Sequence, residues 1–593
     1  MSHGTPECVL ELYSLSDDPA HELIETKPLT TFRGGDENLK IINSWLDECQ
    51  KSHAFCKQRN SLQMPLPTRL LEIADDSTVH LIETGGQVGQ YVALSYCWGP
   101  NPQNNSMTTI SNVRDRLQPR SIRRNELPAA IADAITITES LGIKHIWVDA
   151  LCMIQDSLED KHGELSNMSK YYKNSFLTIA ASTQSCTTGF IGTLGRCEKH
   201  PDSELPSDLV PLPIFAMNRD VDRGGQGTIY VREENPYQIF QEPINQRAWT
   251  MQEMILAPRV LMFGSRVMWF CQHMTHSDGG IEDWSFDDNE MERTRREFQI
   301  ALSNLDRDTN DEEDSQEKKQ PDNSDIYHLW HRIVGTYTRR SLTHAVDKFP
   351  AISAIAAEFA RLSKSDYLAG LWRSNLIRDL LWTTSKPATH RPETWRAPTW
   401  SWASVDDAIF YESGPSEQAT QLAKVERAEV IPVAPMVPFG EIERGRLAIS
   451  APFMRLNITK DNQKDISGML LKDFSFKAGK SEREFLYEAL RSKSFASNTH
   501  SEDEEKKEYE LPEEIFVVFL YGERDKLLPS EDDEGSDKEK KSSSWMMWGL
   551  VLKRSADAAG EKQYERVMSF SRIRCNFEAW DKFESDKETF DLI

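Results

Sequence analysis

The sequence has no long apolar run and no secretory signal. No stretch of its 593 residues approaches the ~20 uninterrupted apolar residues that a membrane-spanning helix needs, so no membrane span is expected. The N-terminus has no basic region followed by an apolar one, which argues against secretion. Hydrophobic residues make up 39% and charged residues 27%, the balance of a globular protein. The expected location is cytoplasmic.

The sequence also lacks a CxxC cysteine pair and has fewer basic than acidic residues. The nine cysteines are an odd number and include no CxxC pair, which favours free thiols over a disulfide framework in a chain without a secretory signal. Lys and Arg total 69 against 94 Asp and Glu, a formal charge of −25 that repels phosphate backbones. No nucleic-acid partner is therefore expected. The GxxxxGK[ST] motif is absent, so no ATPase-type module is expected either.

Length and charge distribution divide the chain into segments. At ~150 residues per unit, two to four folding units are expected. Charge-rich, apolar-poor stretches at 306–325, 502–510 and 529–544 are expected to be solvated loops. The expected segments are an N-terminal extension (1–49), a first domain (50–300), an acidic linker (301–326), a helical segment (327–390) and a β-rich C-terminal region with charged loops (391–593).

Hydrophobic periodicity predicts an α/β fold for the first domain. Strands are predicted at 91–98, 145–149, 176–181 and 259–263, and helices at 127–141, 160–174 and 246–256. This alternation predicts a mostly parallel sheet with flanking helices, in which ligands bind at the carboxyl ends of the strands. Residues 330–382 are predicted to be helical, and the later strands are predicted at 399–403, 446–449, 515–520 and 548–552.

Four blocks of the first domain resemble the signature of the HET domain, named for heterokaryon incompatibility in filamentous fungi. They are 91–99, 127–156, 168–181 and 247–253, and the similarity extends upstream to 66–71 and downstream to 366–372 and 397–404. The resemblance implies an effector of self/non-self recognition that leads to programmed cell death. Its expected partner is another copy of the chain or an allelic or heterologous recognition partner.

HET domains are thought to be distant relatives of TIR domains, which implies a TIR/flavodoxin-like core at 90–265. TIR domains carry a Trp-Cys-x-x-Glu-Leu helix, and Trp249 to Met254 is similar to it, with Glu253 in the position of the catalytic glutamate. Thr250 replaces the usual Cys, and the insertion at 182–244 is not TIR-like. Many TIR domains cleave NAD between nicotinamide and ribose. Because the nicotinamide departs neutral, one carboxylate that stabilises the oxocarbenium-like transition state is enough.

The expected site therefore has one catalytic and several substrate-binding residues. Glu253 is the catalytic candidate, and the substrate-binding candidates are Ser95, Trp98, Asp149 and Trp249. Three of them have a plainer alternative role: Glu253 as a solvated or ion-paired helix residue, Asp149 as the cap of the next turn, and Trp249 as an anchor of its helix. NAD is expected as a substrate, and no cofactor and no metal ligand is assigned.

Weaker alternatives remain for other residues and for the function. Cys152 is a candidate thiol nucleophile, but a lone Cys in an apolar run is usually a small buried hydrophobe. Cys271, His273, His276 and Asp278 are metal-ligand types at close spacing, without the second spaced pair of a zinc ribbon. The alternative function is a non-catalytic signalling or recognition module that acts by protein association. A family member that has lost its toxicity is a third possibility.

Overall fold

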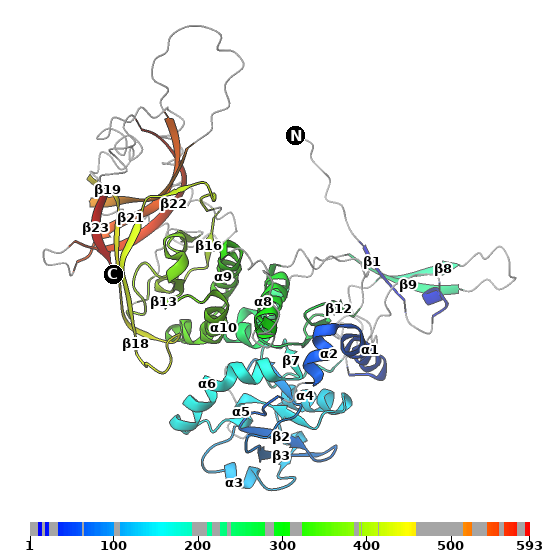
Figure 1. The fold of residues 1–593 in the computed structure, drawn as a ribbon. Coiled ribbons are helices and arrows are strands. Elements are labelled where there is room, and N and C mark those ends of the chain that lie inside the picture. Colours follow the sequence, from blue (N-terminus) through cyan, green and yellow to red (C-terminus); the bar gives the residue numbers. More distant parts are fainter. Residues whose placement is uncertain are drawn as a thin grey trace, which may run out of the picture. The chain divides into compact units, whose positions relative to one another are not determined.

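The chain forms two compact units, Met1–Glu317 and Lys318–Ile593, in a computed structural model (Figure 1). The structure describes residues 10–14, 18–22, 34–61, 64–99, 107–192, 210–215, 226–233, 239–278, 290–308, 323–384, 391–392, 394–412, 414–457, 514–524, 543–556, 562–577 and 587–593.

A nine-stranded mixed sheet forms the centre of the first unit. From edge to edge the strands run in the order β12-β11-β10-β7-β4-β6-β2-β3-β5. Their bounds are β2 Arg69–Ile73, β3 Thr78–Glu83, β4 Val92–Tyr96, β5 Ile122–Arg123, β6 His145–Trp147, β7 Leu177–Ala181, β10 Val260–Phe263, β11 Val267–Phe270 and β12 Thr275–Ser277.

Parallel pairing is confined to the centre of this sheet. β10, β7, β4 and β6 pair in parallel in that order, whereas β11 and β12 at one edge and β2, β3 and β5 at the other pair antiparallel. The expectation of a mostly parallel sheet is therefore wrong for the sheet as a whole. The hairpins come from residues that flank the alternating strand and helix pattern, and hydrophobic periodicity does not reveal pairing direction.

The strands and helices predicted between residues 91 and 263 are confirmed. The helices between the parallel strands are α4 (Ala129–Ser140), the short α5 (Asp149–Cys152), α6 (Leu158–Asn174) and α7 (Trp249–Ile255). Pro128 precedes α4, and Gly142 follows its end with a positive φ of 74°. The Ser157 hydroxyl caps α6 by accepting a hydrogen bond from the backbone N–H of Asp160.

The sheet is buried on both faces. Along β10, Leu261 and Phe263 belong to the main hydrophobic cluster, whereas Val260 and Met262 belong to a second cluster. Successive strand residues point to opposite faces, so this division shows a core on each side. The other helices of this unit are α1 (Asp36–Ser52), α2 (Ala54–Ser61), α3 (Val113–Arg116) and α8 (Glu290–Asp308).

The predicted insertion contains strands of its own. β8 (Val210–Phe215) and β9 (Gln226–Glu233) form a hairpin, and β1 (Leu10–Tyr13) of the N-terminal extension pairs with β9. The extension and the insertion therefore share one three-stranded sheet. Residues 193–209, 216–225 and 234–238 lie outside the described part of the chain.

The first half of the second unit is mainly helical. It contains α9 (Asn323–Thr338), α10 (Ser353–Ser363), α11 (Leu376–Asp379) and two strand pairs, β13 (Tyr367–Leu368) with β14 (Leu371–Trp372) and β15 (Trp382–Thr384) with β16 (Ile409–Tyr411). Ile355, Ala356 and Phe359 of α10 are buried. The strand predicted at 399–403 is wrong, because this segment forms turns that lead into a 3-10 helix. Its aromatic residues are β-prone in composition but pack in the core.

A closed β structure forms the second half of this unit, which confirms the predicted β-rich region. The ring consists of β19 (Ile442–Asn457), β20 (Glu514–Arg524), β21 (Ser543–Arg554), β22 (Gln563–Phe577) and β23 (Lys587–Leu592). It closes because β19 pairs with both β20 and β23, and β17 (Thr420–Gln421) and β18 (Lys424–Pro432) add to its edges.

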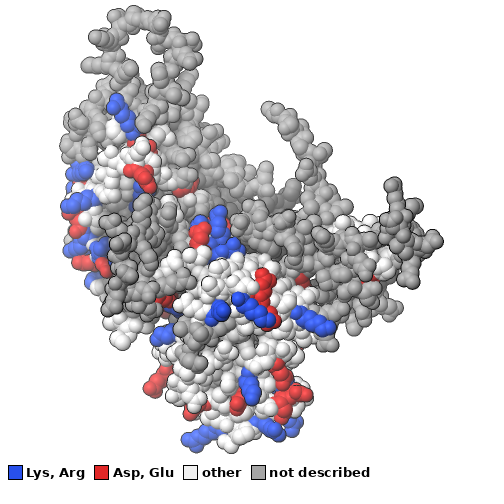
Figure 2. Space-filling view, turned by 45° about the vertical axis from the view of Figure 1, so that its right-hand side comes forward, with Lys and Arg blue, Asp and Glu red and all other residues white. Residues whose placement is uncertain are grey.

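The predicted charged loops fall largely outside the described residues. This holds for 309–322, 502–510 and 525–542. α8 continues to Asp308, so the first residues of the expected acidic linker are helical. Basic and acidic side chains are interspersed on the described surface in the view of Figure 2, without a large patch of one sign. Among the helices that the structure describes, none has the length and apolarity to span a bilayer.

Candidate active site

A serine and a glutamate from distant parts of the chain meet at the carboxyl end of β4. The Ser95 hydroxyl donates a hydrogen bond to Oε2 of Glu253, and the two oxygens lie 2.5 Å apart. Ser95 belongs to β4, and Glu253 comes from α7, which packs against β4 and β7. Both side chains are buried. A carboxylate thus lies at the edge where α/β sheets place their binding groups.

A second carboxylate, that of Asp149, lies close to this pair. Asp149 follows β6 and begins α5, and the indole Nε1 of Trp98 donates to its Oδ2 at 3.0 Å. The backbone N–H of Ala150 donates to Oδ1 at 2.6 Å, and the Tyr96 hydroxyl also hydrogen-bonds to this carboxylate. Asp149 therefore begins α5 and, through its hydrogen bonds with Trp98 and Tyr96, links α5 to the end of β4 and the loop that follows it.

Two further side chains border the carboxylates. Nη1 of Arg247 donates to the backbone carbonyl of Tyr96 at 2.6 Å, and its positive charge acts on both Glu253 and Asp149. The Tyr172 hydroxyl lies within hydrogen-bonding reach of Glu253 and of the Leu94 carbonyl. Sequence reasoning assigned neither Tyr172 nor Arg247 a role in the site. Both lie in the blocks that carry the family resemblance.

Burial dominates the electrostatics of the two carboxyl groups. It raises the pKa of Glu253 to about 7, against the opposing effects of the Ser95 hydrogen bond and the Arg247 charge. Burial also raises the pKa of Asp149, although hydrogen bonds from Ala150 and Trp98 favour its charged form. The negative charge of Asp149 further raises the pKa of Glu253. Proton occupancy of Glu253 therefore changes near neutral pH.

The site is buried at its centre and half-buried at its rim. Glu253 is 8% exposed, whereas Trp98, Asp149 and Arg247 are half-buried. Trp249, one helical turn before Glu253, is also half-buried and packs against the main hydrophobic cluster. The structure thus brings four of the five predicted residues into one hydrogen-bonded and electrostatically coupled group.

Local sequence explains why α7 begins where it does. Thr250, which replaces the usual TIR cysteine, donates its hydroxyl to the carbonyls of Ile244 at 2.5 Å and Arg247 at 2.8 Å. Its hydroxyl thus ties the start of the helix to the preceding 3-10 turn. The loop after β4 turns at Gly99, whose φ is 82°, and a Cβ there would lie 2.4 Å from Ser185 Oγ. Pro100 lies outside the described residues.

A buried glutamate that sequence reasoning missed joins two neighbouring loops. Oε2 of Glu242 accepts a hydrogen bond from the Ser182 hydroxyl at 2.7 Å, directly after β7. Its Oε1 accepts from the backbone N–H of Ser265 at 2.7 Å and from the Ser265 hydroxyl at 2.6 Å, directly after β10. The two loops at this edge of the sheet are therefore held together just before α7.

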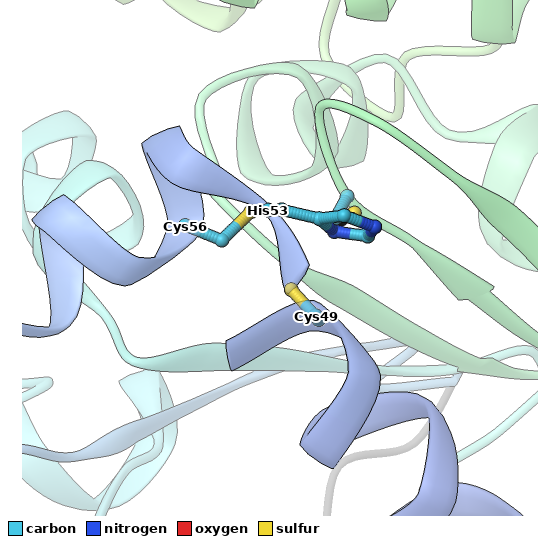
Figure 3. Close-up of side chains that lie close together, drawn as sticks. Cys49, His53 and Cys56 are labelled. Atoms are coloured by element: carbon cyan, nitrogen blue, oxygen red, sulfur yellow. Dashed lines mark hydrogen bonds between the residues drawn. The ribbon is translucent and has the colours of Figure 1, made fainter. Parts of the chain in front are cut away.

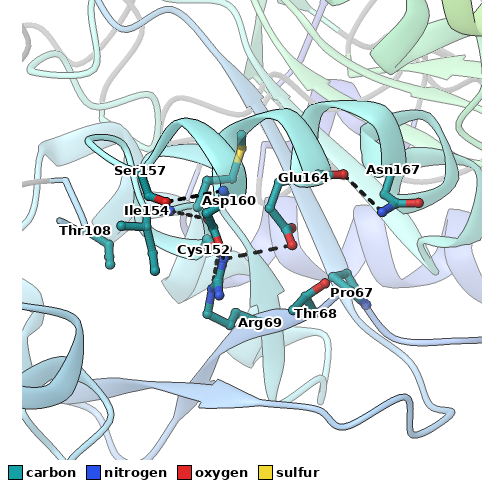
Figure 4. A network of polar contacts seen from close by, with 12 residues as sticks. Pro67, Thr68, Arg69, Thr108, Cys152, Ile154, Ser157, Asp160, Glu164 and Asn167 are labelled. Carbon is teal, nitrogen blue, oxygen red and sulfur yellow. Dashed lines mark hydrogen bonds and ion pairs between the residues drawn. The ribbon is translucent and has the colours of Figure 1, made fainter. Parts of the chain in front are cut away.

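A polar network around Arg69 fixes the segment that carries Asp149 (Figure 4). Arg69, on β2, donates to the Cys152 carbonyl at the end of α5 at 2.8 Å and to both oxygens of Asp160 at 2.5 and 2.6 Å. Asp160 in turn accepts from the backbone N–H of Ile154 at 2.8 Å. Glu164 lies 3.9 Å from the same guanidinium. Residues 66–71, to which the family similarity extends upstream, thus include an arginine with a structural role.

The structure does not support the two weaker hypotheses from the sequence, a Cys152 nucleophile and a metal site at 271–278. Cys152 is fully buried, and burial raises the pKa of its thiol to about 12, which argues against a nucleophile. The candidate metal-ligand run does not form one group of ligands among the described residues: Nε2 of His276 lies 3.3 Å from Oε2 of Glu48, and Asp278 accepts a hydrogen bond from the Val267 N–H. Cys271 instead lies among ligand-type side chains from α1 and α2.

Comparison with known proteins identifies one family. The family model "Heterokaryon incompatibility protein (HET)" matches residues 91–253, which include the strands β4, β6 and β7 and end on Glu253. Searches of curated proteins and of solved structures found no match. The family implies a function related to heterokaryon incompatibility. The chain therefore contains a HET domain at residues 91–253, and this domain includes the Ser95, Asp149 and Glu253 group.

Proposed function

We propose that this chain is an effector of fungal heterokaryon incompatibility whose HET domain cleaves NAD between nicotinamide and ribose, and that the loss of NAD leads to cell death. The observation that carries the proposal is the buried Ser95–Glu253 pair at the carboxyl end of β4, with Asp149 coupled to it. Strongly perturbed carboxyl groups of this kind are concentrated at functional sites.

The order of the parallel strands supports a ligand site at this place. Along the chain the strands come as β4, β6, β7 and β10, whereas in the sheet β4 lies between β6 and β7. The chain therefore runs from β4 to β6 on one side of it and then crosses to β7 on its other side. Such a reversal is typical of flavodoxin-like sheets and marks the position where their ligands bind. This order and the position of Glu253 support the proposed TIR relationship of the HET domain.

The proposed reaction needs a carboxylate but no separate general acid. The bond between ribose C1′ and the nicotinamide nitrogen breaks, and its electron pair goes to the positively charged ring, which leaves as neutral nicotinamide. The positive charge that develops on the ribose is stabilised by ionised Glu253. Water then adds to C1′, and its proton passes to Glu253 or to solvent. A pKa of about 7 makes both forms of Glu253 accessible near neutral pH.

Substrate binding would replace contacts that the chain makes with itself. Ser95 and Tyr172 are placed to donate to Glu253, and Trp98 donates to Asp149. Ribose hydroxyl groups are donors of the same kind, so they are able to take these positions on the two carboxylates. The half-buried rim formed by Trp98 and Asp149 is the side from which the substrate would enter.

The same hydrogen bonds favour a second function, that of a non-catalytic recognition module. Glu253 and Asp149 both have internal donors, which is what a folding role for buried carboxylates requires. In this case the domain would act through self-association or through a recognition partner, and Glu253 would only hold α7 on β4.

The test is nicotinamide release from NAD by the purified full chain at high protein concentration. Wild type is compared with Glu253→Gln and with Glu159→Gln, which makes the same chemical change at an exposed position on α6. We expect wild type and Glu159→Gln to release nicotinamide and Glu253→Gln to lose at least about 100-fold in rate. Equal rates for wild type and Glu253→Gln would overturn the catalytic role. No turnover by any of the three would favour the recognition module.

A further inference from the structure

Three cysteines and one histidine from distant segments meet at a second place in the first unit (Figure 3). Cys49 lies near the end of α1, His53 lies between α1 and α2, and Cys56 lies in α2. Cys271 follows β11 and is separated from His53 by 218 positions in the sequence. The four ligand-type atoms, three Sγ and one ring nitrogen, all lie within 4.8 Å of one another.

We infer that Cys49, His53, Cys56 and Cys271 form a structural zinc site. Zn²⁺ in structural sites takes four ligands in a tetrahedron, and Cys₃His is one of the usual sets. Zinc–sulfur and zinc–nitrogen bond lengths put neighbouring ligand atoms about 3.6–3.8 Å apart. The Nδ1 atom of His53 lies 3.5 Å from Sγ of Cys271, so only small side-chain adjustments are needed to close such a tetrahedron.

Hydrogen-bond donors point at the sulfur atoms, as expected for bound thiolates. The backbone N–H of Met274 donates to Sγ of Cys271 at 3.4 Å, and Nε of Arg259 donates to Sγ of Cys49 at 3.4 Å. The loop that starts at Cys271 is closed by a further bond from the Cys271 N–H to the Met274 carbonyl at 3.0 Å. A tight turn that directs an N–H at its own cysteine sulfur orients a metal ligand.

The charge of the surroundings also fits a zinc thiolate centre. Three thiolates and one Zn²⁺ carry a net charge of minus one, which must be compensated when it is buried. Arg259 is buried beside Cys49 and also donates to the carbonyl of Cys56 at 3.0 Å. Arg295, on α8, is buried in an ion pair with Glu292 at 2.8 Å and donates to the carbonyl of Cys271 at 2.6 Å. The two cations thus hold the ligand-bearing segments in place.

A disulfide or plain core packing explains the group less well. Three cysteines cannot all be paired, and a disulfide does not account for a histidine nitrogen in the same group. Core packing of three thiols as small hydrophobes does not account for a guanidinium aimed at one sulfur. A zinc ion accounts for both features. It would join α1 and α2, which precede the HET domain, to the loop after β11, which follows it.

The test is the metal content of the full chain, expressed without a polyhistidine tag and purified without chelator. We expect about one zinc per chain in wild type and in Cys152→Ser, a buried cysteine outside the group. Cys49→Ser and Cys271→Ser are expected to lose bound zinc. Zinc retained at the wild-type level by both variants, or wild type with no zinc under reducing conditions, would overturn the inference.

Two measurements on wild type remain decisive even if the variants do not fold. X-ray absorption at the zinc edge is expected to show three sulfur neighbours and one nitrogen. Replacement of zinc by Co²⁺ alone is expected to give the intense visible bands of a tetrahedral thiolate site. Octahedral oxygen coordination, or a Cys49–Cys56 disulfide found by mass spectrometry of the freshly purified chain, would contradict the proposed site.

Discussion

The charge state of one buried residue, Glu253, connects the stability of the first unit to pH. Its pKa is raised from an ordinary value of 4.5 to about 7 by burial. The stabilisation from holding a proton in the folded state is therefore fully present below pH 4.5 and is lost as the pH rises through about 7. Glu253→Gln mimics the protonated group and does not titrate.

We predict that wild type loses about 2 kcal/mol of stability, relative to Glu253→Gln, between about pH 5.5 and about pH 8.5. The variant should accordingly be the more stable protein at the alkaline end. Urea denaturation of both proteins at the two pH values measures this difference. A constant difference between the two proteins across this pH range would show that the pKa of Glu253 is not raised.

Among the structural elements, β2 and α5 are joined by the buried guanidinium of Arg69. Arg69→Met would leave Asp160 without its cation and the Cys152 carbonyl without a donor. Removing one partner of a buried ion pair costs about 3–5 kcal/mol, so we predict a loss of this size. The control is Arg123→Met, which removes an exposed cation 3.5 Å from Glu126 and should cost less than about 1 kcal/mol. Thermal or urea unfolding compares the two; equal losses would rule out a buried network.

Sequence patterns predicted those elements whose burial follows a regular period. The parallel strands and α4, α6 and α7 appear where hydrophobic periodicity placed them. The antiparallel edges were missed because the flanking strands β2, β3, β11 and β12, which pair in local hairpins, were not predicted. The segment at 399–403 was misassigned because Trp400 and Trp402 are buried in turns, where aromatic composition reflects packing and not a strand.

The candidate site was predictable only in part for the same reason. The resemblance led to Glu253, and strand ends led to Ser95 and Asp149, because these signals lie within short stretches of sequence. The Ser95–Glu253 bond joins residues 158 positions apart, and no local pattern contains it. The group of Cys49, His53, Cys56 and Cys271 was missed because its fourth member comes from the far side of the HET domain.

At the scale of the whole molecule, no sheet among the described residues contains strands from both units. Within the described residues, the sheets of the first unit lie between residues 10 and 277, and those of the second between 367 and 592. The HET domain and both groups of side chains discussed above belong to the first unit. We therefore place the proposed chemistry in the first unit and leave recognition of a partner as a role for either unit.

The most direct test of the account is made in cells that express the full chain. NAD content and viability are followed together for wild type, Glu253→Gln and Glu159→Gln at matched protein levels. We predict that NAD falls before viability is lost in wild type and in Glu159→Gln, and that Glu253→Gln preserves both. Cells that die with Glu253→Gln as fast as with wild type, while their NAD stays intact, would contradict the proposal that this HET domain acts through chemistry at Glu253.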